Sequence, residues 1–184
     1  MKTNIILCLL ALLFSAQAFG QINNRKFDVR AGAGVSLLGT GDMITFNFEN
    51  ELNIKLNKYF STSVSLNLGR SNRGVFETAS FTQGNLNVYL SPFKNTGRFD
   101  FRLGPGFTYY NISDAYISSQ VWKNGVLIDT NYKFDNRNSY GYNLIIEGTF
   151  LITERFLLGV KLFTQPYHNG DINSGALLKV GVLL

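Results

Sequence analysis

The sequence is poor in residues that carry chemistry or cross-links, with one cysteine, one histidine and one tryptophan among 184 residues. Because Cys8 lies in an N-terminal apolar stretch that we expect to be removed, the remaining chain forms no disulfide, cysteine-ligated metal site or thiol nucleophile. Outside this stretch there is no continuous apolar run, which excludes a membrane protein built from several helices. Charged residues make up only 16%, against roughly 25% in average soluble proteins, but the 45% hydrophobic content excludes a disordered chain.

Residues 1–20 have the layout of a secretory signal: Lys2, an apolar stretch at 5–14, then small residues. The apolar stretch is too short to span a bilayer, which needs about twenty residues. Cleavage after Ala18 or after Gly20 fits the small-residue pattern, and we expect the second. We therefore predict a cleaved signal followed by a single domain at 21–184.

The rest of the sequence alternates apolar and polar residues with a period of two, which is typical of strands with one apolar face. There are eight such runs, at 27–37, 45–56, 60–69, 85–90, 99–109, 140–150, 156–162 and 176–184. Most approach the roughly ten residues that a tilted strand needs to cross a membrane. Phe81 is out of phase, which predicts a nearby β-bulge, and Asn50 interrupts an apolar row, which marks a candidate register shift.

The connections between these runs differ in length. Longer loops are predicted at 38–43, 70–79, 111–138 and 166–174, and generally shorter turns at 57–59, 91–98 and 151–155. Short turns on one side and longer loops on the other are typical of bacterial outer-membrane barrels. The pattern predicts an all-β fold, an eight-stranded antiparallel up-and-down transmembrane β-barrel.

Alternation does not say which face points inward, since a soluble lipocalin-like barrel has its apolar face inside. Here the polar face is rich in glycine and serine, which suits a narrow lumen, and its acids and bases are equal in number. A buried charge is costly unless it is paired, so we predict a salt-bridge network that plugs the lumen. The predicted lumen charge network consists of Asp28, Arg30, Glu49, Glu51, Lys55, Asp100, Arg102, Glu147, Lys161 and Lys179. Aromatic residues gather at both ends of the strands, as in the interfacial girdles of membrane barrels.

With its signal, eight alternating strands and the C-terminal strand at 176–184, the chain resembles the small eight-stranded outer-membrane barrels, the OmpA- and OmpX-like group. It is most similar to the outer-membrane β-barrel domain common in secreted proteins of Bacteroidetes. The resemblance implies residence in the outer membrane of a Gram-negative bacterium, contact with outer-membrane lipid and lipopolysaccharide, and insertion by the barrel assembly machinery. The short turns would then face the periplasm.

No catalytic, metal or cofactor site is predicted. His168 and Ser174 lie in the last loop without a strand-phased arrangement, although some barrels of this size modify lipid with a His and a Ser. The segment 171–175 lacks the bidentate glutamate of a calcium loop. The excess of basic residues is concentrated in the turns rather than along a stripe, so it does not indicate nucleic-acid binding.

The loop at 111–138 is the best candidate for contact with an extracellular partner. Within it, the segment 121–128 with its Asn124-Gly125 pair predicts a hairpin, which would extend the fifth and sixth strands above the membrane. We therefore expect an extended surface hairpin at about 111–138. Its contact candidates are Tyr116, Trp122, Tyr132 and Phe134. The leading hypothesis is a non-enzymatic barrel with a structural or surface-interaction role. The alternatives are a narrow porin or carrier of a small or hydrophobic solute, an enzyme acting on envelope lipid, and a soluble periplasmic binding barrel.

Overall fold

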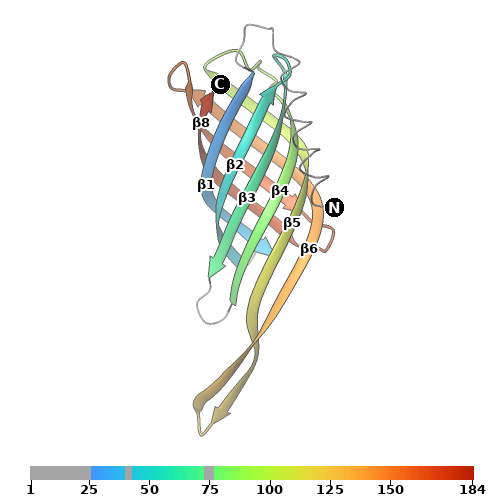
Figure 1. The fold of residues 1–184 in the computed structure, drawn as a ribbon, viewed down its shortest axis with the longest axis vertical. Helices are drawn as coiled ribbons and strands as arrows, with labels where there is room; N and C mark the ends of the chain where they lie inside the picture. Colours follow the sequence, from blue (N-terminus) through green and yellow to red (C-terminus); the bar gives the residue numbers. More distant parts are fainter. Residues whose placement is uncertain (1–25, 40–42, 73–76) are drawn as a thin grey trace, which may run out of the picture.

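The computed structural model describes residues 26–39, 43–72 and 77–184. Its eight strands are β1 (Phe27–Gly39), β2 (Met43–Lys55), β3 (Phe60–Asn72), β4 (Glu77–Leu90), β5 (Phe99–Lys123), β6 (Val126–Leu151), β7 (Phe156–Pro166) and β8 (Ile172–Leu183). Each strand pairs antiparallel with the next, and β8 pairs with β1 to close the barrel (Figure 1). The predicted eight-stranded up-and-down barrel is thus confirmed. The predicted signal at 1–20 lies outside the described residues.

The predicted surface hairpin at about 111–138 is present as a continuous ribbon of strands β5 and β6, which are 25 and 26 residues long. The two strands end in a two-residue turn in which Asn124 has a φ of 52° and Gly125 a φ of 78°. Positive φ at both central residues matches the hairpin turn predicted from the Asn-Gly pair. The ribbon extends well beyond the other strands, at the end opposite the C-terminus (Figure 1).

The two irregularities predicted within the barrel wall are wrong. Phe81 lies in phase on the inner face of β4, 4% exposed, and the β3–β4 and β4–β5 pairings run past it without a shift. Space for its ring comes from Gly69 on β3, where an added Cβ would lie 2.1 Å from the ring. Asn50 also stays in register, opposite Ala31 and Leu66, on the outer face.

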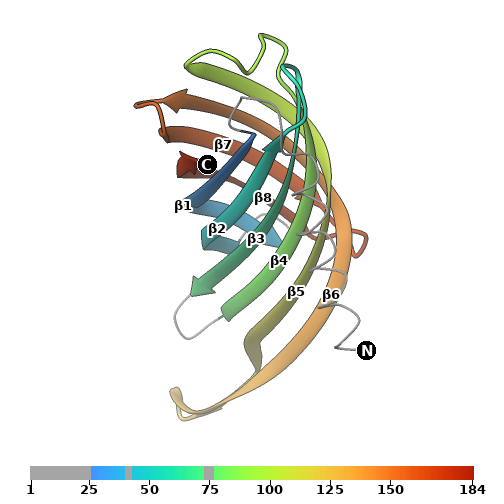
Figure 2. The same ribbon diagram turned by 45° about the horizontal axis from the view of Figure 1, so that its top comes forward.

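Side-chain exposure alternates along the barrel wall in the opposite sense to a soluble protein. Along β2, Ile44 and Phe46 are 68% and 62% exposed, whereas the residue that follows each of them, Thr45 and Asn47, is fully buried. Figure 2 shows the strands tilted around a common axis, so that these buried positions face one narrow interior. No helix of the described residues is long and apolar enough to cross a membrane.

Gly34 allows the two ends of the sheet to meet. It lies on β1 opposite Leu177 of β8, and an added Cβ would stand 2.0 Å from the carbonyl oxygen of Ala176. Since this neighbour is backbone, it cannot move aside as a flexible side chain can.

We expect Gly34→Ala to destabilise the closed barrel by about 1–3 kcal/mol or more, because the methyl group overpacks the β1–β8 seam. The measurement is urea unfolding of the protein refolded in lipid vesicles. Gly84→Ala on β4 is the matched control, since a Cβ there meets nothing within 4 Å. Equal stability of the two variants would contradict this account of closure.

Candidate functional site

All ten residues of the predicted lumen charge network lie on the inner face of the barrel, but they form two groups. The central charge cluster is at most 2% exposed and consists of Asp28, Arg30, Glu49, Glu51, Arg102, Glu147, Lys161 and Lys179. These four acids and four bases come from β1, β2, β5, β6, β7 and β8. The charges of the cluster therefore cancel within the barrel.

Glu147 on β6 is a centre of this cluster. Its Oε1 accepts hydrogen bonds from Arg30 and from Arg102, the latter at 2.9 Å, and its Oε2 lies 3.4 Å from Lys179 Nζ. Arg30 also bonds Asp28 on the same strand. Three cations from three strands thus converge on one carboxylate.

The carboxylates of β2 pair with two of these cations, Arg102 and Lys179, and also with Lys161 of β7. Glu51 lies 2.7 Å from Arg102 and 2.6 Å from Lys179, and Glu49 lies 2.6 Å from Lys161. A charge-assisted hydrogen bond is short and strong, and each of these carboxylates has at least two cationic neighbours. The cluster ties strands together across the lumen, in addition to the backbone ladder around the wall.

Tyr89 closes one side of the cluster. Its ring centroid lies 3.9 Å from the guanidinium carbon of Arg102, and the side chain is fully buried. A desolvated cation over an aromatic face is favourable by about 2 kcal/mol. The alternation placed Tyr89 on the inner face, but it did not identify this contact.

The remaining two network residues, Lys55 and Asp100, lie nearer the turns. Lys55 Nζ donates to the carbonyl of Asn95 at 3.2 Å, and Asp100 is 7% exposed. Both line a cavity of about 30 Å³ with Asp28, Arg30 and Arg98. This volume is about that of one water molecule, so it is no passage.

On the hairpin side of the charges lies a layer of amide side chains that the sequence analysis missed. Gln83 Nε2 donates to Gln165 Oε1 at 2.9 Å, and the Tyr167 hydroxyl donates to Gln83 Oε1 at 2.9 Å. Asn85 and Asn173 bond into the same group. The period of two does place these amide side chains on the inner face. Which of them meet across the lumen depends on the stagger of the strands, which the sequence does not give.

Beyond the amides, an apolar group that we call the lumen lid fills the hairpin end of the interior. It consists of Leu38, Met43, Ala79, Phe81, Tyr110, Ile112 and Tyr167. The rings of Tyr110 and Tyr167 lie 4.0 Å apart between centroids. The lumen is therefore filled by apolar side chains at the hairpin end, in addition to the central charge cluster.

Arg137 holds the base of the hairpin over this lid. Its guanidinium lies 2.8 Å from Asp114, 3.5 Å from Asp135 and 3.3 Å from Asp171, which joins β5, β6 and the β7–β8 loop. Although partial burial acts to lower it, the carboxylates of Asp114 and Asp171 raise the pKa of Arg137 above its ordinary value. The Tyr110 hydroxyl donates to Asp171 and so connects this clamp to the lid.

The four contact candidates of the hairpin do not form one cluster. By strand alternation, Tyr132 and Phe134 continue the outer wall of the barrel, 44% and 79% exposed, whereas Tyr116 pairs with Lys133 on the opposite face. Trp122, 59% exposed, lies beyond two register shifts, next to the turn. Other exposed apolar side chains around it belong to Val121, Val126, Leu127 and Ile128.

The two residues considered for chemistry are not brought together by any contact that the structure records. The His168 ring lies 5.1 Å from that of Tyr140, and the Ser174 hydroxyl shares a hydrogen bond of 2.6 Å with Thr164. Among residues 26–39, 43–72 and 77–184, no group of three or more His, Cys, Asp and Glu is placed to hold a metal ion.

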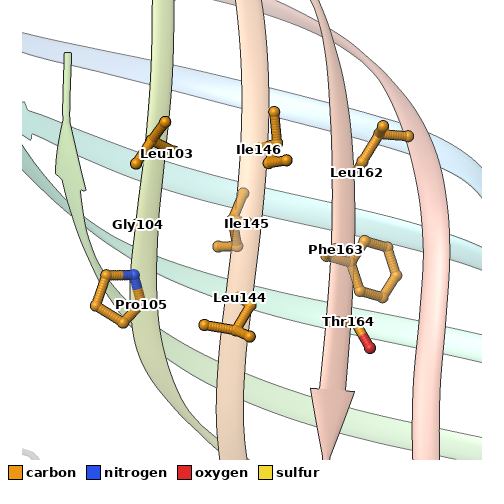
Figure 3. A pocket seen from close by; sticks show the side chains of 9 residues that line it. All are labelled: Leu103, Gly104, Pro105, Leu144, Ile145, Ile146, Leu162, Phe163 and Thr164. Carbon is orange, nitrogen blue, oxygen red and sulfur yellow. The ribbon is translucent and has the colours of Figure 1, made fainter. Parts of the chain in front are cut away.

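An apolar groove of about 610 Å³ crosses β5, β6 and β7 (Figure 3). Gly104 contributes no side chain there, and Pro105 follows it on the same strand. The groove is lined by Leu103, Gly104, Pro105, Leu144, Ile145, Ile146, Leu162, Phe163 and Thr164. Such a lining suits contact with hydrocarbon and offers little to orient a polar ligand.

Comparison with solved structures gives the same fold. Neisserial surface protein A matches with a TM-score of 0.62 at 12% identity, covering 86% of this chain and 97% of that one. A major outer membrane protein of Thermus thermophilus matches at 0.60 and 14%, with coverages of 85% and 97%. Ail, the attachment invasion locus protein of Yersinia pestis, matches at 0.59 and 10%, again covering 85% and 97%. No known family profile and no curated protein sequence matches the chain.

We expect Glu147→Gln to destabilise the folded barrel by about 3–5 kcal/mol, because it leaves the cations around it with one buried carboxylate too few. Urea unfolding in vesicles measures this. Ser61→Ala is the matched control, since this hydroxyl is buried on the inner face without a hydrogen-bond partner, and it should leave stability nearly unchanged.

A second substitution distinguishes charge balance from loss of packing. Lys179→Gln combined with Glu147→Gln restores neutrality and should recover part of the lost stability. Additive costs for the two substitutions would show that these side chains are not coupled.

Proposed function

We propose that the protein is a non-enzymatic integral barrel of the bacterial outer membrane, with a plugged lumen and a hairpin for contacts outside the cell. The fold that it shares with small eight-stranded outer-membrane proteins supports this reading. The observation that carries it is the inverted burial: along β2 the outward apolar side chains are exposed and the inward polar ones are buried.

Hydrocarbon is the solvent that fits this outer surface. A closed barrel pairs its backbone groups from strand to strand, as an apolar medium requires, and leaves no sheet edge within it. Outward residues such as Val64, Leu66 and Val180 are about half exposed on the wall. An apolar belt of this kind would be costly in water and is favourable in lipid. Insertion would use the barrel assembly machinery, and the outer leaflet would supply lipopolysaccharide.

The interior supports a structural plug rather than a channel. The central charge cluster, the amide layer and the lumen lid occupy successive levels of the lumen. Opening a path for ions would require breaking several buried ion pairs at once. The narrow porin or solute carrier is therefore the second candidate.

The hairpin supports a surface-interaction role. Its tip carries Trp122 and neighbouring exposed apolar side chains, at the end of the two-stranded β5–β6 ribbon. Aromatic residues are enriched at the centres of protein interfaces, so this tip is the region most suited to an extracellular partner.

Heat-modifiability and conductance together test the barrel and its plug. The protein should fractionate with the outer membrane and migrate differently in gels with and without boiling. In planar bilayers we expect no steady stepwise conductance, because the central charge cluster occupies the lumen. A soluble periplasmic protein without a mobility shift would refute the lipid-facing wall. Stepwise conductance whose ion selectivity changes in Glu147→Gln would favour the pore.

The fluorescence of Trp122 tests whether the hairpin lies in water or in the bilayer. As the only tryptophan of the chain, it should emit like tryptophan in water, be quenched by iodide, and escape quenching by brominated lipids. The control is Phe156→Trp combined with Trp122→Phe, which moves the probe to an outward position beside the β6–β7 turn. Brominated lipids should quench this control. Equal quenching of both proteins would mean that the hairpin rests on the bilayer.

A further inference from the structure

The rim at the turn end of the barrel, opposite the hairpin, carries an excess of positive charge. Its basic residues are Lys26, Lys58, Lys94, Arg98 and Arg155. Lys58, Lys94, Arg98 and Arg155 are exposed and Lys26 half-buried, and Glu154 is the only acidic residue of these turns. Five cations against one carboxylate give this rim a net side-chain charge of +4.

The backbone beneath these cations is fixed by hydrogen bonds between neighbouring segments. The carbonyl of Lys58 accepts from Asn95 N–H at 2.9 Å, and that of Arg98 accepts from Leu151 N–H at 2.7 Å. The carbonyl of Arg155 accepts from Leu183 N–H at 2.8 Å. In the same way, the carbonyl of Lys26 binds Lys55 N–H at 2.8 Å. Four of the five basic residues are thus held at set places around the rim.

Aromatic side chains mark the same level of the wall. Phe93 is 77% exposed, and Phe99 and Phe156 are each 57% exposed, all next to basic residues of the turns. Lys58 Nζ lies 5.2 Å from the ring centroid of Tyr59. Rings at the edge of an apolar belt, with cations just beyond them, match the order of acyl chain and phosphate in a lipid leaflet.

The opposite end has no such excess. At the hairpin end, the basic side chains that the structure describes are Arg70, Lys123, Lys133 and Arg137, and the acidic ones are Asp114, Asp129, Asp135 and Asp171. These charges cancel, and Arg137 is paired with three of the acids. The difference in net charge between the two ends therefore comes from the basic residues of the turn rim.

We infer that the turn rim binds anionic phospholipid headgroups of the leaflet in which it sits. This inference rests on the proposed membrane function. A phosphate between two neighbouring turns meets a preformed ring of cations, and each basic residue near an anionic surface favours such lipid by about fivefold. The rim thereby selects phosphatidylglycerol-type lipid over zwitterionic lipid and sets the depth of the barrel.

The test is native mass spectrometry of the folded protein released from nanodiscs that contain equal amounts of phosphatidylglycerol and phosphatidylcholine. The lipids that stay bound should be enriched in phosphatidylglycerol by about fivefold or more over the mixture. Lys58→Gln, Lys94→Gln and Arg155→Gln combined leave Lys26 and Arg98 on the rim and should lower the enrichment several-fold. Arg98 is kept, because it also lines the lumen cavity.

The matched control removes three exposed cations from the other end, with Arg70→Gln, Lys123→Gln and Lys133→Gln combined. It should keep the enrichment. Equal loss in both triple variants, or no enrichment in the unaltered protein, would overturn the inference. A gel shift on boiling, recorded for each sample, separates this result from failure of the proposed function, in which no barrel forms in either lipid.

Salt provides a second measurement that needs no variant. Because headgroup contacts at the rim are solvent-exposed, the enrichment of the unaltered protein should fall as ionic strength rises. An enrichment that is unchanged by salt would also overturn the inference, since it would point to acyl-chain packing on the wall.

Discussion

Closure of the sheet on itself is the constraint on which the rest of the molecule depends. The pairing of β1 with β8, from Asp28 opposite Leu183 to Gly39 opposite Ile172, removes both sheet edges. With the edges gone, the outer wall can be apolar throughout without exposing unpaired N–H and C=O groups. The same closure encloses a narrow interior, in which every inward side chain must fit and the buried charges need partners.

That interior explains the unusual distribution of charge. Arg30 and Arg102 are long side chains in a space that eight strands keep small, and burying them alone would be prohibitive. Each shares Glu147, so that attraction across the lumen compensates for lost hydration. The cluster also acts on the fold as a whole, because several of its ion pairs join strands that are not neighbours in the wall, such as Arg30 of β1 with Glu147 of β6.

Much of the barrel could be predicted from the sequence, because the period of two is a local property. It predicted the eight strands and assigned residues such as Glu49 and Lys179 to the same face. The partners of those residues could not be predicted, since Arg30 and Glu147 are 117 positions apart and meet only through the stagger of the closed sheet. Phe81 was misjudged for the same reason: whether an aromatic ring fits inside depends on Gly69 across the strand pair.

The hairpin could be predicted from its turn but not from its period. Beyond the wall both faces of the β5–β6 ribbon are largely exposed, so its sequence no longer alternates, and a period of two alone would leave the segment as a loop. What marks it as a ribbon is the Asn124-Gly125 turn at its centre.

The two ends of the barrel are built on different principles. At the hairpin end Arg137 clamps three carboxylates above an apolar lid, so charges there close the mouth and hold the ribbon upright. At the turn end the backbone is interlocked by hydrogen bonds and the cations face outward. The barrel is therefore asymmetric along its axis, with paired charges at the hairpin end and an excess of exposed cations at the turn end.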